Sequence, residues 1–395
     1  MKTCKPVARA AIIADEDWNQ ALYQALESVR GTYPDVVLLF ASGEYAAHYQ
    51  DMLHILRHEL AAPLLIGCSA QGTIGTGIEL ENAPALSLLT LSLPEATLYP
   101  VRIPVDLLEQ GNSPVSMRET LNVPLDDVNA WLFFLDPFHM DCESLVEHLS
   151  GAYPDIPMLG GLASNDIEEH RSYIFFNDEV FTDGGVALAL GGAYSILPLV
   201  SQGCEPIGEP WTITRVQDNG LVETISNRPA YEMLIETFQG LPYTLQRRAQ
   251  HNLLVGLAAD EYRATFERGT FLIRNLLGVD RSTGALALGA QPRVGQTIQF
   301  QMRDAQAADH DLRTRLSHLK DKLVGNTPIA AILCTCNGRG EDLFSAPHHD
   351  AGLIEQILGP IPLAGLFCNG EIGPVGRRSF LHGFTASIAV LVHRR

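Results

Sequence analysis

Two stretches, Gly67-Cys-Ser-Ala-Gln-Gly-Thr-Ile-Gly75 and Gly365-Leu-Phe-Cys-Asn-Gly-Glu-Ile-Gly373, carry glycine, an amide, glycine, isoleucine and glycine at identical spacing. Each follows a short apolar run that is typical of a buried strand. A third stretch keeps Gly161 and the amide Asn165, and then departs with Asp166 where the others have glycine. The recurrence predicts an internally duplicated chain. Chance similarity between apolar α/β patterns is the alternative explanation.

Outward from these loops, the same order of elements recurs three times: strand, helix, strand, loop, strand. Apolar runs predict the strands, and 3.6-residue periodicity with capping residues predicts the helices. The fold class is therefore α/β, with mixed sheets built from repeated units in two domains. The elements expected are 36–40, 46–60, 63–66 and 85–93 in the first copy, 131–135, 142–150, 156–160 and 184–190 in the second, and 329–334, 351–358, 361–367 and 384–392 in the third.

A different region lies between the second and third copies. Residues 211–225 alternate in strand fashion around Asn219-Gly220, which is a hairpin signal. Glycines and prolines cluster at 203–210 and indicate a domain boundary there. The predicted organisation is a helical lead-in over 1–30, one α/β domain over 31–205 and a second over 206–395.

Composition restricts the function classes. With 27 basic and 46 acidic residues in 395, the net charge is −19, which disfavours nucleic acid and membrane surfaces as partners. Seven scattered cysteines and the lack of a signal-peptide pattern predict a soluble cytoplasmic protein without disulfides. Common phosphate-loop, dinucleotide and zinc motifs are absent from the sequence, so no cofactor and no metal are expected.

The third copy carries the richest loop chemistry. Arg339 follows one strand, and Asn369 and Glu371 follow its expected neighbour, so the three side chains would converge on a pocket rim. Arginine offers a planar fork to a carboxylate and glutamate accepts an ammonium group, which suits a zwitterion such as an amino acid. A structural salt bridge between Arg339 and Glu371 is the alternative.

Further candidates for ligand binding surround these loops. Arg274 interrupts an apolar stretch, where a charge is costly unless it is paired or meets a ligand. The remaining candidates are small or polar residues of the glycine-rich loops, together with one histidine: Cys68, Ser69, Ser164, Asn165, Asp166, Cys336, Asn337 and His382. An enzyme using Cys336, Cys368 or Cys68 as nucleophile with His382 as base is an alternative to a binding protein.

At these residues the chain resembles the FIST family of prokaryotic sensory domains, which has N-terminal and C-terminal parts. The N-terminal resemblance rests on Leu65-Ile-Gly-Cys-Ser69 and Leu159-Gly-Gly161, and the C-terminal resemblance on Cys336-Asn-Gly-Arg-Gly340, Gly370-Glu-Ile-Gly-Pro374 and His382-Gly-Phe-Thr385. The resemblance lies in the order and spacing of these segments, and it covers nearly the whole chain from about residue 30.

The resemblance implies a role as the input side of signal transduction, with amino acids as the usual ligand proposal for the family. Many family members are fused to output domains, and no output segment is recognisable in this sequence. We therefore predict a sensory binding protein for a small polar ligand that acts through a separate signalling partner. A protein-interaction scaffold is a further alternative.

Overall fold

The computed structural model describes residues 5–111, 113–165 and 170–394. The chain divides into two compact units: the first comprises residues 1–200, 312–381 and 385–395, and the second comprises 201–311 and 382–384. Along the sequence, the second unit is thus an insertion in the first. The third copy of the predicted repeat belongs to the same unit as the first two, so the compact units do not follow the expected stretches 31–205 and 206–395.

The first unit contains three six-stranded sheets, and each is centred on one copy of the repeat. In every copy two parallel strands are joined by a helix, and a third strand pairs antiparallel with the first. The elements are β2 (Val36–Ser42), α2 (Tyr49–Leu60), β3 (Leu65–Ala70) and β6 (Ala85–Ser92); β8 (Ala130–Leu135), α5 (Cys142–Ala152), β9 (Met158–Leu162) and β12 (Gly185–Gly192); and β21 (Pro328–Cys336), α10 (His349–Leu358), β22 (Leu363–Cys368) and β25 (Thr385–His393). The predicted fold class of mixed sheets from repeated units is confirmed.

Each repeat begins with an edge strand, and the sequence analysis missed this strand in the first two repeats. These strands are β1 (Val7–Ala14), β7 (Ala96–Ile103) and β13 (Tyr194–Gln202), and each lies beside the last strand of its own repeat. Helices follow: α1 (Trp18–Ser28) after β1, α3 (Leu107–Gln110) and α4 (Pro114–Leu121) after β7, and α8 (Ala305–Lys322) in the third repeat. Residues 7–28 are therefore part of the first repeat rather than a separate helical lead-in.

The two-stranded hairpin in each repeat leaves its own sheet and completes another. The hairpin β4 (Gly72–Gly75) and β5 (Ile78–Glu81) joins β22, β10 (Ile174–Phe176) and β11 (Glu179–Phe181) join β3, and β23 (Glu371–Val375) and β24 (Arg378–His382) join β9. The first repeat thus completes the third, the third completes the second and the second completes the first. This closed exchange ties the three repeats into one unit.

A glycine in each sheet permits the exchange. Gly67, Gly160 and Gly365 sit at the same register position of their parallel strands. A Cβ added at these glycines would lie 1.8 to 2.0 Å from a carbonyl oxygen of the neighbouring strand. Gly160 is therefore the structural counterpart of Gly67 and Gly365 in the second copy, one residue before Gly161, which the sequence comparison used. Ser164 rather than Asn165 consequently occupies the position of the amides Gln71 and Asn369.

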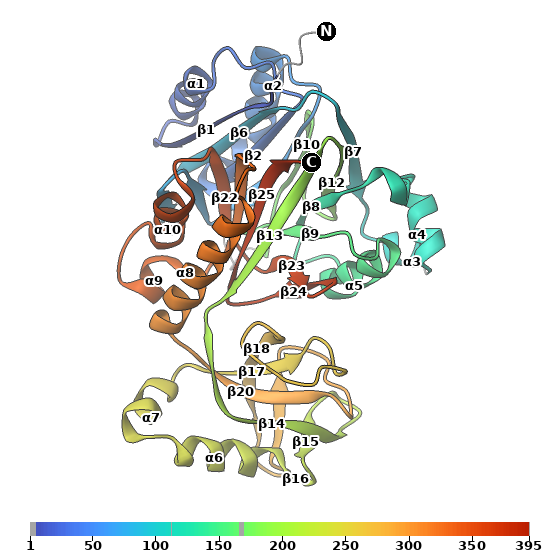
Figure 1. The fold of residues 1–395 in the computed structure, drawn as a ribbon, viewed down its shortest axis with the longest axis vertical. Helices are drawn as coiled ribbons and strands as arrows, with labels where there is room; N and C mark the ends of the chain where they lie inside the picture. Colours follow the sequence, from blue (N-terminus) through green and yellow to red (C-terminus); the bar gives the residue numbers. More distant parts are fainter. Residues whose placement is uncertain (1–4, 112, 166–169, 395) are drawn as a thin grey trace. The chain divides into compact units, whose positions relative to one another are not determined.

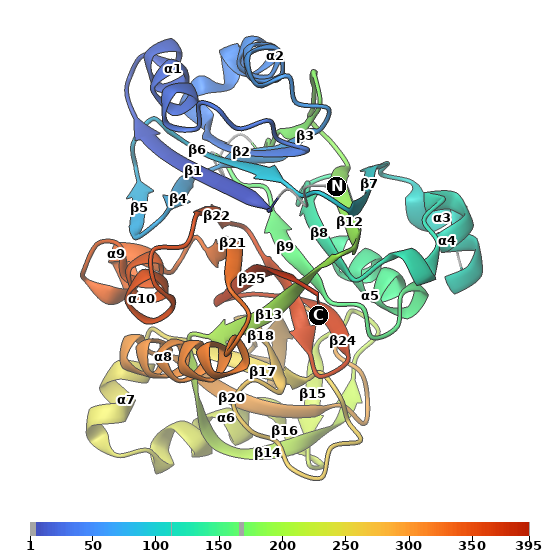
Figure 2. The same cartoon turned by 45° about the horizontal axis from the view of Figure 1, so that its top comes forward.

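Alternation along the central strands divides their side chains between two cores. In β2, Leu38 and Phe40 enter a core shared by all three repeats, whereas Val37 and Leu39 pack against α1 and α2. The strands β8 and β21 alternate in the same way between the shared core and their own helices. Figures 1 and 2 show α1 and α2 over β1, β2 and β6, and Figure 2 shows α8 and α10 beside β21 and β22. Burial on both faces explains the continuous apolar runs in the sequence.

The second unit is a mainly antiparallel assembly with its own core. Its strand order is β14-β20-β17-β18-β19-β15-β16, and β14 also pairs with β15, which closes the sheet on itself. Its elements are β14 (Cys204–Val216), β15 (Val222–Ile225), β16 (Arg228–Pro229), α6 (Ala230–Gly240), α7 (Tyr243–Ala249), β17 (Leu253–Ala258), β18 (Phe271–Asp280), β19 (Ala285–Leu288) and β20 (Thr297–Arg303). The predicted hairpin around Asn219-Gly220 is the turn between β14 and β15.

Candidate functional site

The loops that follow β3, β9 and β22 meet at Ser164. Its hydroxyl donates a hydrogen bond to the carbonyl oxygen of Phe367 at 2.5 Å and accepts one from the amide of Gln71 at 2.8 Å. Its backbone amide donates to the carbonyl oxygen of Ser69. One buried serine therefore joins the carboxyl ends of three strands that are far apart in the sequence, β3, β9 and β22.

Several predicted ligand contacts gather around this junction. Asn337 donates from Nδ2 to Oδ1 of Asn369 at 2.8 Å, and Asn369 donates from Nδ2 to the carbonyl oxygen of Ala163. The Asn165 side chain packs on the backbone at Gly43, where an added Cβ would overlap it. Asn369 is exposed, and Asn337, Asn165 and Cys336 are half-buried, so these four remain predictions as ligand contacts. Cys68, Ser69 and Ser164 are fully buried in the same region, and Asp166 lies outside the described residues.

Arg339 is inside the protein, not on a pocket rim. Its side chain is 1% exposed and forms a two-pronged ion pair with Asp350 of α10, with Nε to Oδ2 at 2.7 Å and Nη2 to Oδ1 at 2.9 Å. Burial acts to raise the pKa of Asp350, but Arg339 and His349 outweigh it and lower that pKa. The expected rim position is wrong because the turn after β21 folds Arg339 back toward this carboxylate.

Glu371 is also buried, because it begins β23 and pairs in register with Gly161 of β9. Its Oε2 accepts hydrogen bonds from the amide of Thr385 at 3.0 Å and from the hydroxyl of Thr385 at 2.7 Å. Burial raises the pKa of Glu371 to about 7, although the bonds from Thr385 act to lower it. Glu371 is therefore wrong as an exposed acceptor for an ammonium group, and the ion partner of Arg339 is Asp350 instead.

The cysteines proposed as nucleophiles are mostly core residues. Cys68 and Cys368 are fully buried, and burial raises the pKa of each thiol well above its usual value. Cys336 lies directly opposite Cys368 in the parallel pair β21–β22 and is half-buried. A raised thiol pKa opposes formation of the reactive thiolate.

Arg274 and His382 belong to the second unit. Arg274 lies in β18 and donates from Nη1 to the carbonyl oxygen of Ile273 at 3.0 Å. Both side chains are buried, with 8% and 3% exposed. Their roles as ligand contacts remain predictions.

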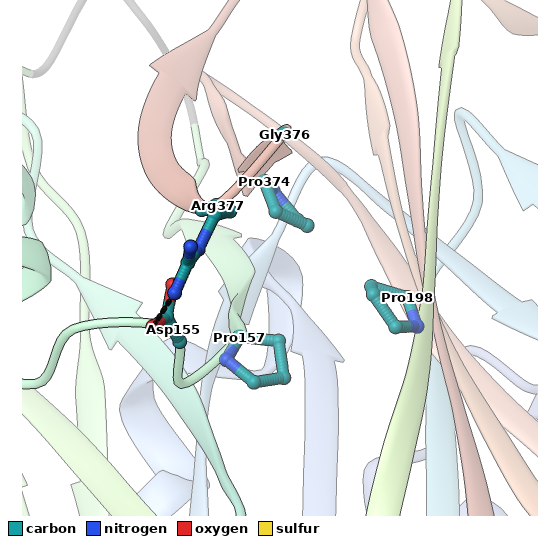
Figure 3. Close-up of a pocket in the computed structure, with 6 residues that line it drawn as sticks. All are labelled: Asp155, Pro157, Pro198, Pro374, Gly376 and Arg377. Atoms are coloured by element: carbon teal, nitrogen blue, oxygen red, sulfur yellow. Dashed lines mark hydrogen bonds and ion pairs between the residues drawn. The ribbon is translucent and has the colours of Figure 1, made fainter.

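A surface hollow of about 390 Å³ lies elsewhere in the first unit. Asp155 and Pro157 precede β9, Pro374 and Arg377 belong to the β23–β24 hairpin, and Pro198 lies in β13. Figure 3 shows Arg377 reaching to Asp155, with the rings of Pro157 and Pro374 near the pair and Pro198 across from it. Both guanidinium contacts, from Nε and from Nη2, go to the carboxylate. Hydrogen bonding to Arg377 lowers the pKa of Asp155, and the same pairing raises the pKa of Arg377.

A second hollow of about 380 Å³ is lined by nitrogen- and hydroxyl-bearing side chains. They come from the loop after β8 and from both ends of the β10–β11 hairpin: His139, His170, Arg171, Tyr173 and Thr182. The sequence analysis missed the lining residues of both hollows. The turn Gly376-Arg377 was a usable signal, whereas nothing local relates Asp155 or His139 to its neighbours in space.

Comparison with known proteins identifies the family. The FIST N domain matches residues 35–228, and the FIST C domain matches residues 230–374. The chain belongs to the FIST family. FIST domains are associated with the sensory binding of small ligands in signalling.

Relatives along the full length of this FIST chain are uncharacterized proteins. One from Mycobacterium tuberculosis is 36% identical over 99% of this chain and 98% of its own length. One from Mycobacterium bovis is 35% identical over 98% of this chain and 96% of its own length. A solved structure of cyanuric acid hydrolase from A. caulinodans covers 99% of this chain and 100% of its own, at 9% identity and a TM-score of 0.33, a likeness too low to carry an argument.

The FIST domain boundaries differ from the compact units of the structure. The FIST N match ends after β15 and the FIST C match begins at α6, so the second unit is shared between the two matches. Within the part of the chain that the structure describes, no helix has the length and apolar character needed to cross a bilayer.

Proposed function

We propose that this FIST protein is a sensory binding protein for a small zwitterion, with amino acids as the ligand class. The observation that carries the proposal is the hollow in which Arg377 and Asp155 present opposite charges beside three proline rings. Its volume of about 390 Å³ falls within the range of about 300–1,000 Å³ that is common for small-molecule sites.

The two charges match the two ends of an amino acid. Arg377 uses Nε and Nη2 for Asp155, so Nη1 is not engaged in this ion pair and can meet the carboxylate of a ligand. Asp155 accepts hydrogen bonds and can receive the ammonium group. Both shifts in pKa favour the charged forms near neutral pH. Pro157, Pro198 and Pro374 are rigid, so apolar contact with a ligand side chain costs little conformational entropy.

The position of the hollow suggests how ligand binding could change the protein. Asp155 and Pro157 belong to the second repeat, whereas Pro198 and Arg377 belong to the third. A ligand bound to both charges would therefore tighten the joint between two repeats of the same unit. We propose that a separate partner protein recognises this tightened state. A ligand transmits a signal only through such a difference in affinity between two states.

A thermal-shift screen of amino acids and small carboxylates tests this function. Ligand at a hundred times its dissociation constant should add about 2.7 kcal/mol to the free energy of unfolding. Arg377→Ala and Asp155→Asn should abolish this gain for the same ligand. Arg378→Ala, the matched control at the neighbouring exposed position, should keep it. No stabilisation by any amino acid, or equal stabilisation of the Arg377 variant, would contradict the proposal.

A further inference from the structure

The hollow around His139 differs in chemistry from the one around Arg377. Among the residues that the structure describes, its lining consists of two imidazoles, a guanidinium, a phenol and a hydroxyl, without an acidic side chain: His139, His170, Arg171, Tyr173 and Thr182. Every one of these groups can donate a hydrogen bond, with the imidazoles doing so in the appropriate tautomer. Such a lining is unusual in a chain with 46 acidic and 27 basic residues.

A buried carboxylate fixes the orientation of His139. Asp136, at the end of β8, is 0% exposed and lies 2.7 Å from Nδ1 of His139. Oδ1 of Asp136 accepts from the Ser172 hydroxyl at 2.6 Å, and Oδ2 accepts from the His139 amide at 2.9 Å. The contact with Asp136 occupies Nδ1, so Nε2 on the other edge of the ring remains for a ligand.

Tyr173, which also lines the hollow, is anchored as well. Tyr173 exchanges two hydrogen bonds with Ser69, since its amide donates to Oγ at 2.9 Å and its carbonyl oxygen accepts from the Ser69 amide at 2.8 Å. Its ring meets Tyr49 edge-on, with the centroids 5.2 Å apart. Asp183, which follows Thr182, is engaged by Nη2 of Arg102 at 2.8 Å. Two acidic groups of the described residues near the hollow, Asp136 and Asp183, thus both accept hydrogen bonds from donors of the protein.

We propose that this hollow binds a phosphate group. A phosphate presents oxygen acceptors in several directions, which suits donors that come from the loop after β8 and from both ends of the β10–β11 hairpin. A planar carboxylate would engage donors on fewer sides. The volume of about 380 Å³ accommodates a phosphate together with a small organic group. Inorganic phosphate and a phosphate monoester share this chemistry. The site is separate from the proposed amino acid site and does not depend on it.

Calorimetric titration of the full chain with inorganic phosphate and with glycerol phosphate tests the proposal. Saturable binding of either is expected, and the tighter of the two identifies the source of the group. His139→Ala and His170→Ala should weaken binding at least tenfold, and Thr182→Val, directly after β11, should weaken it severalfold without removing a charge. Arg377→Ala serves as the matched control and should bind phosphate as the unaltered protein does.

Three results would overturn the phosphate site. The first is no binding of either compound at millimolar concentration. The second is an affinity of the His139, His170 and Thr182 variants that equals that of the unaltered protein, and the third is binding of succinate without binding of phosphate. The Thr182 variant keeps the test decisive if loss of the His139–Asp136 contact prevents folding. Because the Arg377 variant removes the amino acid response alone, failure of one proposal is distinguishable from failure of the other.

Discussion

Ile74 of β4 lies directly opposite Gly365 of β22, although the two residues belong to the first and the third repeats. The same relationship recurs between Ile372 and Gly160, and Phe175 lies opposite Gly67. A large apolar residue of one repeat thus faces the glycine of the repeat that it completes. The two loop sequences share the Gly…Ile spacing because each supplies a glycine to its own sheet and an isoleucine to the sheet of another repeat.

Gly365→Ala should prevent folding or cost more than the roughly 3 kcal/mol typical of ordinary overpacking. The added Cβ would lie 2.0 Å from the carbonyl oxygen of Leu333, and a strand backbone cannot move aside without breaking its ladder. Urea unfolding measures the change. Gly352→Ala, in α10 with open space around it, is the matched control and should stabilise by about 0.5–1 kcal/mol. Equal stability of both variants would refute this account of the glycine.

Arg339→Met should destabilise the protein by about 3–5 kcal/mol, because it leaves the buried carboxylate of Asp350 without its cation. Adding Asp350→Leu to the same chain should recover part of the loss, since both members of the buried ion pair are then removed. Arg30→Met breaks an exposed pair with Glu27 and should cost less than about 1 kcal/mol. Chemical denaturation of all four proteins compares them. A small effect of Arg339→Met would show that the pair is not desolvated in solution.

Glu371→Gln should change how stability depends on pH. The pKa of Glu371 is raised from 4.5 to about 7, so the folded protein binds the proton more tightly than the unfolded chain. Stability from this group is therefore greatest below pH 4.5 and falls as the pH rises to about 7. The loss is at most roughly 3 kcal/mol, because one pKa unit corresponds to about 1.4 kcal/mol.

Glutamine keeps an oxygen for Thr385 and does not ionise, which makes the variant a close replacement for the protonated acid. The difference in unfolding free energy between the two proteins, measured from pH 4.5 to 8, should follow a single titration in favour of the variant at high pH. A constant difference over this range would mean that Glu371 ionises normally.

Ser164→Ala should cost about 1–3 kcal/mol, because the amide of Gln71 and the carbonyl oxygen of Phe367 lose a shared partner in a buried position. Ser317→Ala is the matched control: its hydroxyl bonds to Arg313 on an exposed helix face, and its removal should change stability by less than about 0.5 kcal/mol. Thermal unfolding compares the two. An equal effect would mean that the loops do not depend on Ser164.

The elements with strong apolar periodicity could be predicted from the sequence, and the exchange between repeats could not. Strands such as β2 and β8 are buried on both faces, which gives runs that are visible without a structure. The hairpin strand β4 has four residues, two of them glycine, and its partner in β22 is far away in the sequence. Nothing local encodes that pairing. The edge strand β1 was missed because its mixed burial resembles neither template.

The candidate sites show the same division. Convergence of the loops followed from strand order: Ser164 does accept a hydrogen bond from Gln71, and Asn337 donates one to Asn369. Arg339 in a glycine-rich loop suggested an exposed cation, because its partner Asp350 is fixed only when α10 packs beside β21. Arg377 was missed because its role depends on Asp155, which another repeat supplies. Contacts between repeats form only in the tertiary structure, so they cannot be predicted from composition and spacing.

The circular sharing of hairpins constrains how the protein matures on the ribosome. The sheet around β9 lacks its outer strands until residues 371–382 have been synthesised, and the one around β22 takes its outer strands from residues 72–81, which emerge long before it. The strands that are synthesised early therefore have unpaired backbone edges until their partners are made, and such edges are prone to aggregation. The exchange of hairpins between the three repeats is completed late in translation. Chaperone protection of the nascent chain matters most before that point.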